Sequence, residues 1–169
     1  MQFNIGDRVI HPVHGVGRIV KVERQAFTGA PRMYYEVSAM NTTVWVPVDA
    51  QDQIGLRLLT AKSELSKYRS VLKSRPASLS KDHGKRHFEL TERLKKRSFQ
   101  AVCEVVRDLT AHSWNKPLTG ADTASLRKAR EDLEQEWAAS EEAPVAKVSA
   151  EIETLITHSR AASKKIIAH

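Results

Sequence analysis

The sequence predicts a protein of two domains, in which a small β barrel of the SH3 or Tudor type precedes an all-α helical bundle. Up to about residue 58, short runs of β-branched and aromatic residues alternate with turns rich in Gly, Pro and Asn. After Arg57 the apolar residues recur at steps of three and four, which is the period of a helix. Aromatic residues make up only 6% of the 169 residues and charged residues 28%, which favours a helix-rich surface over a large all-β core.

The first domain, residues 1–58, divides into four or five short strands. Strands are expected over residues 8–11, 18–23, 33–40 and 43–48. Pro12 ends the first because it has no amide hydrogen, and Gly15 and Gly17 allow tight bending before the second. Turns over residues 28–31 and 41–42 separate the others. Several short strands in so small a segment predict a barrel that keeps exposed edges.

The second part of the chain is expected to be helical. Helices are predicted over residues 62–74, 81–97, 100–112 and 121–139, with a last one beginning near Pro144. Thr119 has an acid three residues after it, the spacing of a capping box for the fourth helix. We interpret residues 59–80 as a helix and linker, residues 81–160 as the helical domain, and residues 161–169 as a frayed polar tail, although Ile166 and Ile167 could extend the packing.

The net charge of +7 is concentrated in the middle of the chain. Residues 61–116 hold fourteen Lys and Arg against six Asp and Glu, whereas residues 119–153 hold four against nine. A basic block followed by an acidic one predicts a positive face that meets polyanions. The alternative is an ordinary solvated helix surface, and the concentration of the surplus in one block favours nucleic-acid contact.

The sequence offers no active site, metal centre or cofactor site. Cys103, the single cysteine, lies beside an apolar stripe with no activating base, so we expect an inert core thiol and no internal disulfide. His83 and His87 have a spacing that zinc could use, but no third ligand accompanies them. No phosphate-binding glycine loop is present. Without a long apolar run we expect no membrane span, and these features favour a cytoplasmic binding protein that acts as a monomer.

The residues of the first domain also resemble a known family. The resembling residues are Gly6-Asp7, Pro12, His14-Gly15-Val16-Gly17, Tyr34-Tyr35, Val46-Pro47-Val48 and Gly55-Leu56-Arg57. Together they are similar to the N-terminal module of the bacterial CarD/CdnL transcription regulators, which is shared with the polymerase-binding part of transcription-repair coupling factor. A second block over residues 104–109 resembles the family's helical C-terminal domain, and the resemblance covers about residues 3–137. It implies a transcription regulator that binds the RNA polymerase β subunit and promoter DNA and modulates open-complex stability.

The resemblance implies that the module adds a strand to the lobe of the β subunit. The predicted contacts are Thr43, Val44, Trp45, Val46 and Pro47. Alternation along this strand places Val44, Val46 and Val48 towards the core and leaves Trp45 outward, where a tryptophan is a frequent hot spot. The alternative is that Trp45 covers the base of the barrel or packs on the helical domain. The family often has a basic residue here, so Trp45 is a departure.

The basic helix would supply the contact with promoter phosphates and the minor groove. The predicted DNA contacts are His83, Lys85, Arg86, Arg93, Lys95 and Lys96. In the family a Trp at the start of this helix wedges into the minor groove at the upstream edge of the melted promoter. The matching stretch here is His83-Gly84-Lys85-Arg86-His87, so His83 holds the wedge position. An imidazole is smaller and more polar than an indole, which weakens such a wedge.

Two alternatives to this function remain. One is a polymerase-binding factor with little DNA contact. The other is a Tudor-like protein-interaction module unrelated to transcription, in which Tyr34, Tyr35 and Trp45 would form an aromatic cage. Strand alternation argues against the cage because it places the two neighbouring tyrosines on opposite faces of the sheet.

Overall fold

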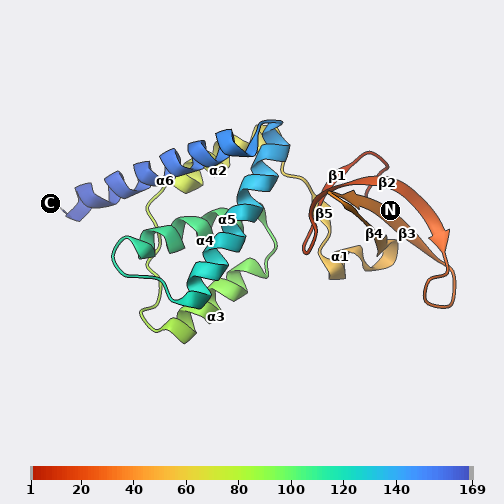
Figure 1. Ribbon diagram of the computed structural model, residues 1–169, viewed down its shortest axis with the longest axis horizontal. Coiled ribbons are helices and arrows are strands. Elements are labelled where there is room, and N and C mark those ends of the chain that lie inside the picture. Colours follow the sequence, from red (N-terminus) through yellow and green to blue (C-terminus); the bar gives the residue numbers. More distant parts are fainter. Residues whose placement is uncertain (1, 168–169) are drawn as a thin grey trace. The chain divides into compact units, whose positions relative to one another are not determined.

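The structure, a computed structural model, describes residues 2–167 and the side chains as far as Lys164. The chain divides into two compact units, Met1–Leu59 and Thr60–His169, the first built of strands and the second of helices (Figure 1). The predicted order of a β domain followed by a helical domain is therefore confirmed. Among the described residues, no helix is long and apolar enough to cross a membrane.

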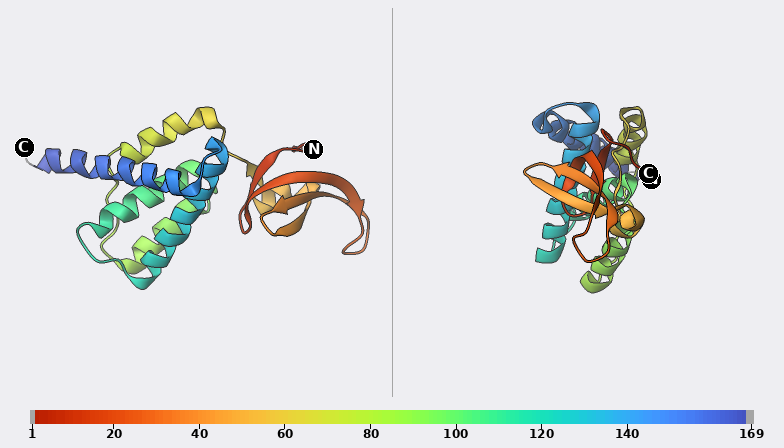
Figure 2. Two further views of the ribbon diagram at one scale, coloured as in Figure 1. Left: turned by 45° about the horizontal axis from the view of Figure 1, so that its top comes forward. Right: turned by 90° about the vertical axis from the view of Figure 1, so that its right-hand side faces the viewer.

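The N-terminal unit is a five-stranded antiparallel sheet with the strand order β4-β3-β2-β1-β5. Its strands are β1 (Arg8–His11), β2 (Gly15–Gln25), β3 (Arg32–Ala39), β4 (Thr42–Pro47) and β5 (Arg57–Leu58). Between β4 and β5 lie a 3₁₀ turn, Val48–Ala50, and the short helix α1 (Gln51–Ile54). An irregularity in the β2–β3 register after Ile19 accompanies the bending of these two strands, and the sheet curls around its core (Figure 2).

One face of the curled sheet forms the core of the N-terminal unit. The buried residues of this core are Phe3, Val9, Ile19, Tyr35, Val37, Val46 and Leu56. The Tyr35 hydroxyl accepts hydrogen bonds from the backbone amides of Gln2 and Phe3, at 3.2 and 3.3 Å. The Phe3 ring meets the Tyr35 ring edge-on at a centroid distance of 5.6 Å. These contacts hold the segment before β1 against the core of the N-terminal unit.

The turn between β1 and β2 depends on two glycines and a buried histidine. Gly15 has a φ of +72°, which disfavours a side chain, and a Cβ on Gly17 would lie 2.8 Å from Cγ1 of Val37. The ring of His11 is buried, and its Nδ1 accepts hydrogen bonds from the amides of Val13 and His14 at 3.1 and 3.2 Å. His11 therefore stabilises the turn.

Five α-helices make up the C-terminal unit as far as it is described, to residue 167. They are α2 (Leu65–Lys73), α3 (His83–Leu94), α4 (Phe99–Ser113), α5 (Gly120–Glu141) and α6 (Val145–Ile167). The N-caps of α3, α4 and α5 are Asp82, Ser98 and Thr119, whose side chains accept hydrogen bonds from backbone amides of the first helical turn. The start of α5 at Thr119 agrees with the predicted cap. These caps determine where each helix begins and hence which residues face the bundle interior.

Helix α2 belongs to this unit and is not part of a linker. Leu65, Tyr68 and Leu72 are buried in the same cluster as α4, α5 and α6, because their spacing gives α2 a continuous apolar side. The helical domain consequently begins at Thr60, whereas the sequence placed its start at residue 81.

Helix α6 also extends further than the sequence predicted. It is helical as far as Ile167, so the described part of residues 161–169 is not frayed. Ser159 is fully buried, and the guanidinium of Arg160 lies over the ring of Trp114 at 5.2 Å, which ties this end of the helix to the bundle. The side chains of Ile166 and Ile167 and all of residues 168–169 lie outside the described part.

The chain passes from one unit to the other without a free linker. The amide of Leu59 donates to the carbonyl oxygen of Arg8, at 2.9 Å, within the N-terminal unit. The next residue, Thr60, donates from its amide and its hydroxyl to Oε1 of Glu136, at 3.2 and 2.7 Å, within the helical unit. Consecutive residues are therefore hydrogen-bonded into different units.

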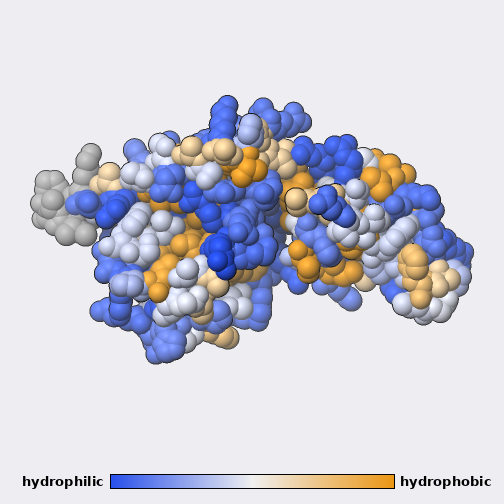
Figure 3. Space-filling model, in the orientation of Figure 1, coloured by the Kyte–Doolittle hydropathy of each residue, from blue (hydrophilic) through white to orange (hydrophobic). Residues whose placement is uncertain are grey.

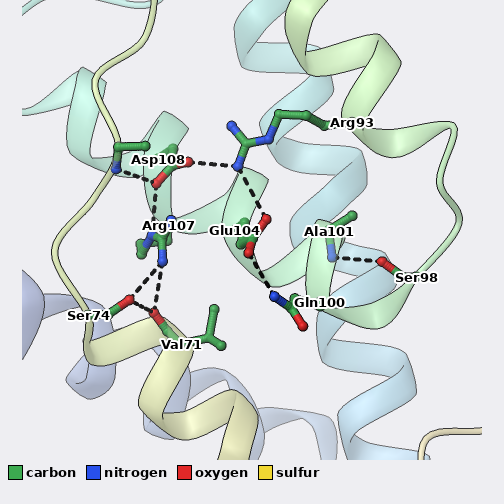
Figure 4. A network of polar contacts seen from close by, with 10 residues as sticks. Val71, Ser74, Arg93, Ser98, Gln100, Ala101, Glu104, Arg107 and Asp108 are labelled. Carbon is green, nitrogen blue, oxygen red and sulfur yellow. Dashed lines mark hydrogen bonds and ion pairs between the residues drawn. The ribbon is translucent and has the colours of Figure 1, made fainter.

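A buried carboxylate joins four segments of the helical unit (Figure 4). Asp108 on α4 accepts from the amide of Ala77, from Nε of Arg107 and from a terminal nitrogen of Arg93, at 3.0, 2.8 and 2.7 Å. Arg107 in turn donates to the Val71 carbonyl and to Ser74 Oγ at the end of α2, at 3.2 and 2.7 Å. Two guanidiniums and one amide thus compensate the carboxylate.

Replacing Asp108 with Ala should lower the free energy of unfolding of the helical unit by roughly 3–5 kcal/mol, because both arginines lose their buried partner. The matched control is Asp132→Ala, since Asp132 pairs with Lys128 on the exposed surface of α5. That change should cost about 0–1 kcal/mol. Urea unfolding followed by helical circular dichroism compares the two variants. Equal losses would show that the Asp108 network does not stabilise the unit.

Candidate functional site

Strand β4 lies at an edge of the sheet, as the predicted polymerase-binding strand requires. It pairs with β3 through registers such as Glu36↔Trp45 and Val37↔Val44, and no other described strand pairs with it. The side of β4 that faces away from β3 can therefore accept an added strand through main-chain hydrogen bonds.

The side chains of β4 alternate as predicted. Val46 is buried, with Val44 and Val48 packed against the core, while Thr43 is exposed. Trp45 lies on the outer face but is only half exposed, because the ring of Phe27 covers part of it at a centroid distance of 5.4 Å. Trp45 is therefore neither fully exposed nor part of the core.

Phe27, Tyr34 and Trp45 form an outer aromatic cluster on β3, β4 and the turn before β3. Phe27 also meets Tyr34 edge-on at 5.1 Å, and its own side chain remains 54% exposed. Apolar surface gathers at the hairpin that joins β2 and β3 (Figure 3). Sequence reasoning missed Phe27 because it treated this hairpin only as a turn. The sequence does contain a signal for this cluster, because an aromatic residue stands directly before the turn Thr28-Gly29-Ala30-Pro31.

The aromatic cage considered from the sequence does not form. Tyr35 lies in the core of the N-terminal unit, whereas Tyr34 and Trp45 lie on the outer face. The three rings cannot surround one ligand, as strand alternation predicted.

Arg86 is not available to DNA. Its side chain is 5% exposed and forms an ion pair with the buried carboxylate of Asp122, with Nε 2.7 Å from Oδ2. It also donates to the carbonyl oxygens of Ser80 and Lys81, at 2.9 and 3.3 Å. The predicted phosphate contact at Arg86 is therefore corrected. Arg86 lies one helical turn before the buried Leu90 and so faces the bundle, where it fixes α3 to the start of α5.

Arg93 is also used within the fold. It is 25% exposed, and its guanidinium binds Asp108 at 2.7 Å and approaches Glu104 at 3.8 Å. Lys95 is exposed but pairs with Glu92 on the surface of the helix. Lys85 and Lys96 are exposed, and no ion pair involves either of them among the described side chains. Of the predicted DNA contacts, the exposed residues with a permanent positive charge are thus lysines.

His83 is the first residue of α3 and is exposed. The preceding Asp82 caps the helix by accepting a hydrogen bond from the Lys85 amide at 2.8 Å, and this bond lowers the pKa of the Asp82 carboxyl below its ordinary value. An ionised carboxylate therefore sits next to the predicted wedge position and opposes the approach of phosphates there. His87 is exposed as well.

Two chemical possibilities raised by the sequence are a reactive thiol and a metal site. Cys103 is fully buried, and burial raises the pKa of its thiol, so the reactive thiolate is disfavoured. Among the described His, Cys, Asp and Glu side chains, no group of three or more could hold a metal ion.

Comparison with known families agrees with the division into two units. Residues 3–59 match the CarD-like/TRCF RID domain, an RNA polymerase-interacting domain, and residues 67–153 match the CarD C-terminal domain. The chain belongs to the CarD family of transcription factors. It is also similar to the Bacillus subtilis (strain 168) protein named "Putative transcription factor YdeB", with 28% identity over 133 residues. The aligned region covers 78% of this chain and 87% of that protein.

Family membership gives the N-terminal unit its role as the RNA polymerase-interacting domain. The CarD family is a family of transcription factors and is not known for catalysis, which agrees with the reading of the chain as a binding protein. The β4 edge and the outer aromatic cluster both lie within residues 3–59, and α3 lies within the CarD C-terminal domain.

Replacing Arg86 with Ala should lower the melting temperature of the helical unit by roughly 10 °C or more, because Asp122 would keep a buried charge without its partner. Lys85→Ala, at the neighbouring exposed position, should leave the melting temperature nearly unchanged. Thermal unfolding of the full chain compares the two. A stable Arg86→Ala variant would show that the pair with Asp122 is dispensable for folding.

Proposed function

We propose that this CarD-family protein, as a monomer, joins the β subunit of RNA polymerase to promoter DNA and thereby changes the lifetime of the open complex. The N-terminal unit would bind the β-subunit lobe through β4, and α3 would contact the promoter. The observation that carries this proposal is an exposed edge strand inside the RNA polymerase-interacting domain.

The polymerase contact combines main-chain and side-chain recognition. Hydrogen bonds from the open side of β4, from Thr43 to Pro47, would give affinity without depending on side-chain identity. The outer aromatic cluster stands beside this edge and adds apolar area that a partner can cover. Phe27 and Trp45 are the anchors we propose for that area, since half-exposed aromatic residues are frequent hot spots.

The DNA contact rests on fewer cations than the sequence counts. Lys81, Lys85 and Lys96 are exposed in and around α3, and lysines of this kind bind phosphates through counterion release. Arg86 and Arg93 are held in internal ion pairs. Because these two arginines are held inside the fold, a second candidate function is a polymerase-binding factor with little DNA contact. Under both candidate functions His83, which lies beside the Asp82 carboxylate, would be a weak wedge.

For the polymerase interface, Trp45→Ala and Phe27→Ala should each weaken binding to the isolated β-subunit lobe, the former by roughly 2 kcal/mol or more. Val13→Ala is the matched control, because Val13 is 73% exposed in the turn between β1 and β2, away from β4 in the strand order. Calorimetric titration provides the affinities, and circular dichroism checks folding. Unchanged affinity in a folded Trp45→Ala protein would remove the cluster from the interface.

For the DNA interface, Lys85→Glu should weaken promoter binding and flatten its salt dependence. Each phosphate contact contributes about −0.9 to the slope of log affinity against log salt concentration. Lys128→Glu makes the same change of charge on α5, where Lys128 is exposed and pairs with Asp132, and should leave the slope unchanged. If both variants keep the slope of the unaltered protein, the second candidate function is favoured.

A further inference from the structure

The outward side of α3 carries a large apolar side chain that the fold does not use. Phe88 is 63% exposed, and none of the described aromatic pairs includes its ring. A helix turns by about 100° per residue, so Phe88 points opposite the direction shared by Arg86, Leu90 and Arg93, which face the bundle. It is therefore the side chain of α3 that projects furthest from the core.

The surroundings of Phe88 are cationic and open. Lys85 shares its side of the helix, one turn before it, and Lys95 is the C-cap residue two turns after it. Lys81 is exposed just before the N-cap Asp82. The acid on this side, Glu92, is paired with Lys95. One turn before Phe88 stands Gly84, which has no side chain to cover the ring.

These surroundings favour one kind of partner. An apolar protein surface that covered Phe88 would also remove Lys85 from water without compensating its charge, since no ion pair involves Lys85 among the described side chains. Duplex DNA offers a phosphate to Lys85 and a stacked, apolar base step to the ring at the same time. Apolar side chains that enter the minor groove partly unstack such steps. Pyrimidine–purine steps such as TA are flexible and are easily unstacked.

We propose that Phe88 enters a base step of promoter DNA while Lys85, on the same side of α3, holds a flanking phosphate. This inference rests on the proposed DNA contact and specifies its geometry. Phe88 lies five residues after His83, which places it about 140° further round the helix. The DNA then faces the lysine side of α3 and not its N-cap, where the ionised Asp82 stands.

The experiment uses the full chain and a forked, A·T-rich duplex with the fluorescent base 2-aminopurine at a TA step. The unaltered protein should increase the fluorescence as the base unstacks. Phe88→Ala should lose most of the increase, even at saturating protein, and should bind on the order of tenfold more weakly. Phe88→Trp should retain the signal because an indole stacks well. Val13→Ala, which removes an exposed apolar side chain from the N-terminal unit, should retain it as the control.

The variants distinguish a failure of the proposed Phe88 insertion from a failure of the proposed DNA contact itself. If Lys85→Glu weakens DNA binding while Phe88→Ala changes neither affinity nor fluorescence, the DNA contact stands and the insertion of Phe88 is overturned. If the unaltered protein shows no salt-dependent binding to the fork, the proposed DNA contact and the insertion both fail. If Phe88→Ala instead weakens binding to DNA-free RNA polymerase, Phe88 is a protein contact and the inference is wrong. An unchanged melting temperature of Phe88→Ala excludes a folding defect, since the side chain is exposed.

Discussion

The helical unit depends on one buried carboxylate. Asp108 binds the end of α2 through Arg107, the following segment through the Ala77 amide, and α3 through Arg93. Asp108 is buried, so its charge would lie without compensation in a place that water does not reach if these partners were lost together. A second pair, Arg86 with Asp122, fixes the other end of α3. Between them the two carboxylates determine which side of α3 faces outward.

The two buried carboxylates pair with arginines, so the arginines and the lysines near α3 have different roles. Arg86 and Arg93, with a planar fork of donors, occupy internal pairs, whereas Lys85 on the same helix stays in water. The charge surplus of residues 61–116 is therefore partly structural, and its exposed part is smaller and composed mainly of flexible point charges. Such a surface suits the positioning of a protein on phosphates more than the reading of a base sequence.

Local signals in the sequence were sufficient for much of the fold. The strands, the inward valines of β4 and the cap at Thr119 follow from alternation and turn chemistry within a few residues. The internal pairs of Arg86 and Arg93 could not be predicted, because their acidic partners lie 36 and 15 residues away and only packing brings them together. The contact of Phe27 with Trp45 has the same origin, since it crosses the hairpin and the neighbouring strand.

The junction at Leu59 and Thr60 has a mechanical consequence. Each residue is hydrogen-bonded into its own unit, so the covalent connection between the two units is short. A short connection of this kind raises the effective concentration of one unit's binding surface once that of the other unit is occupied.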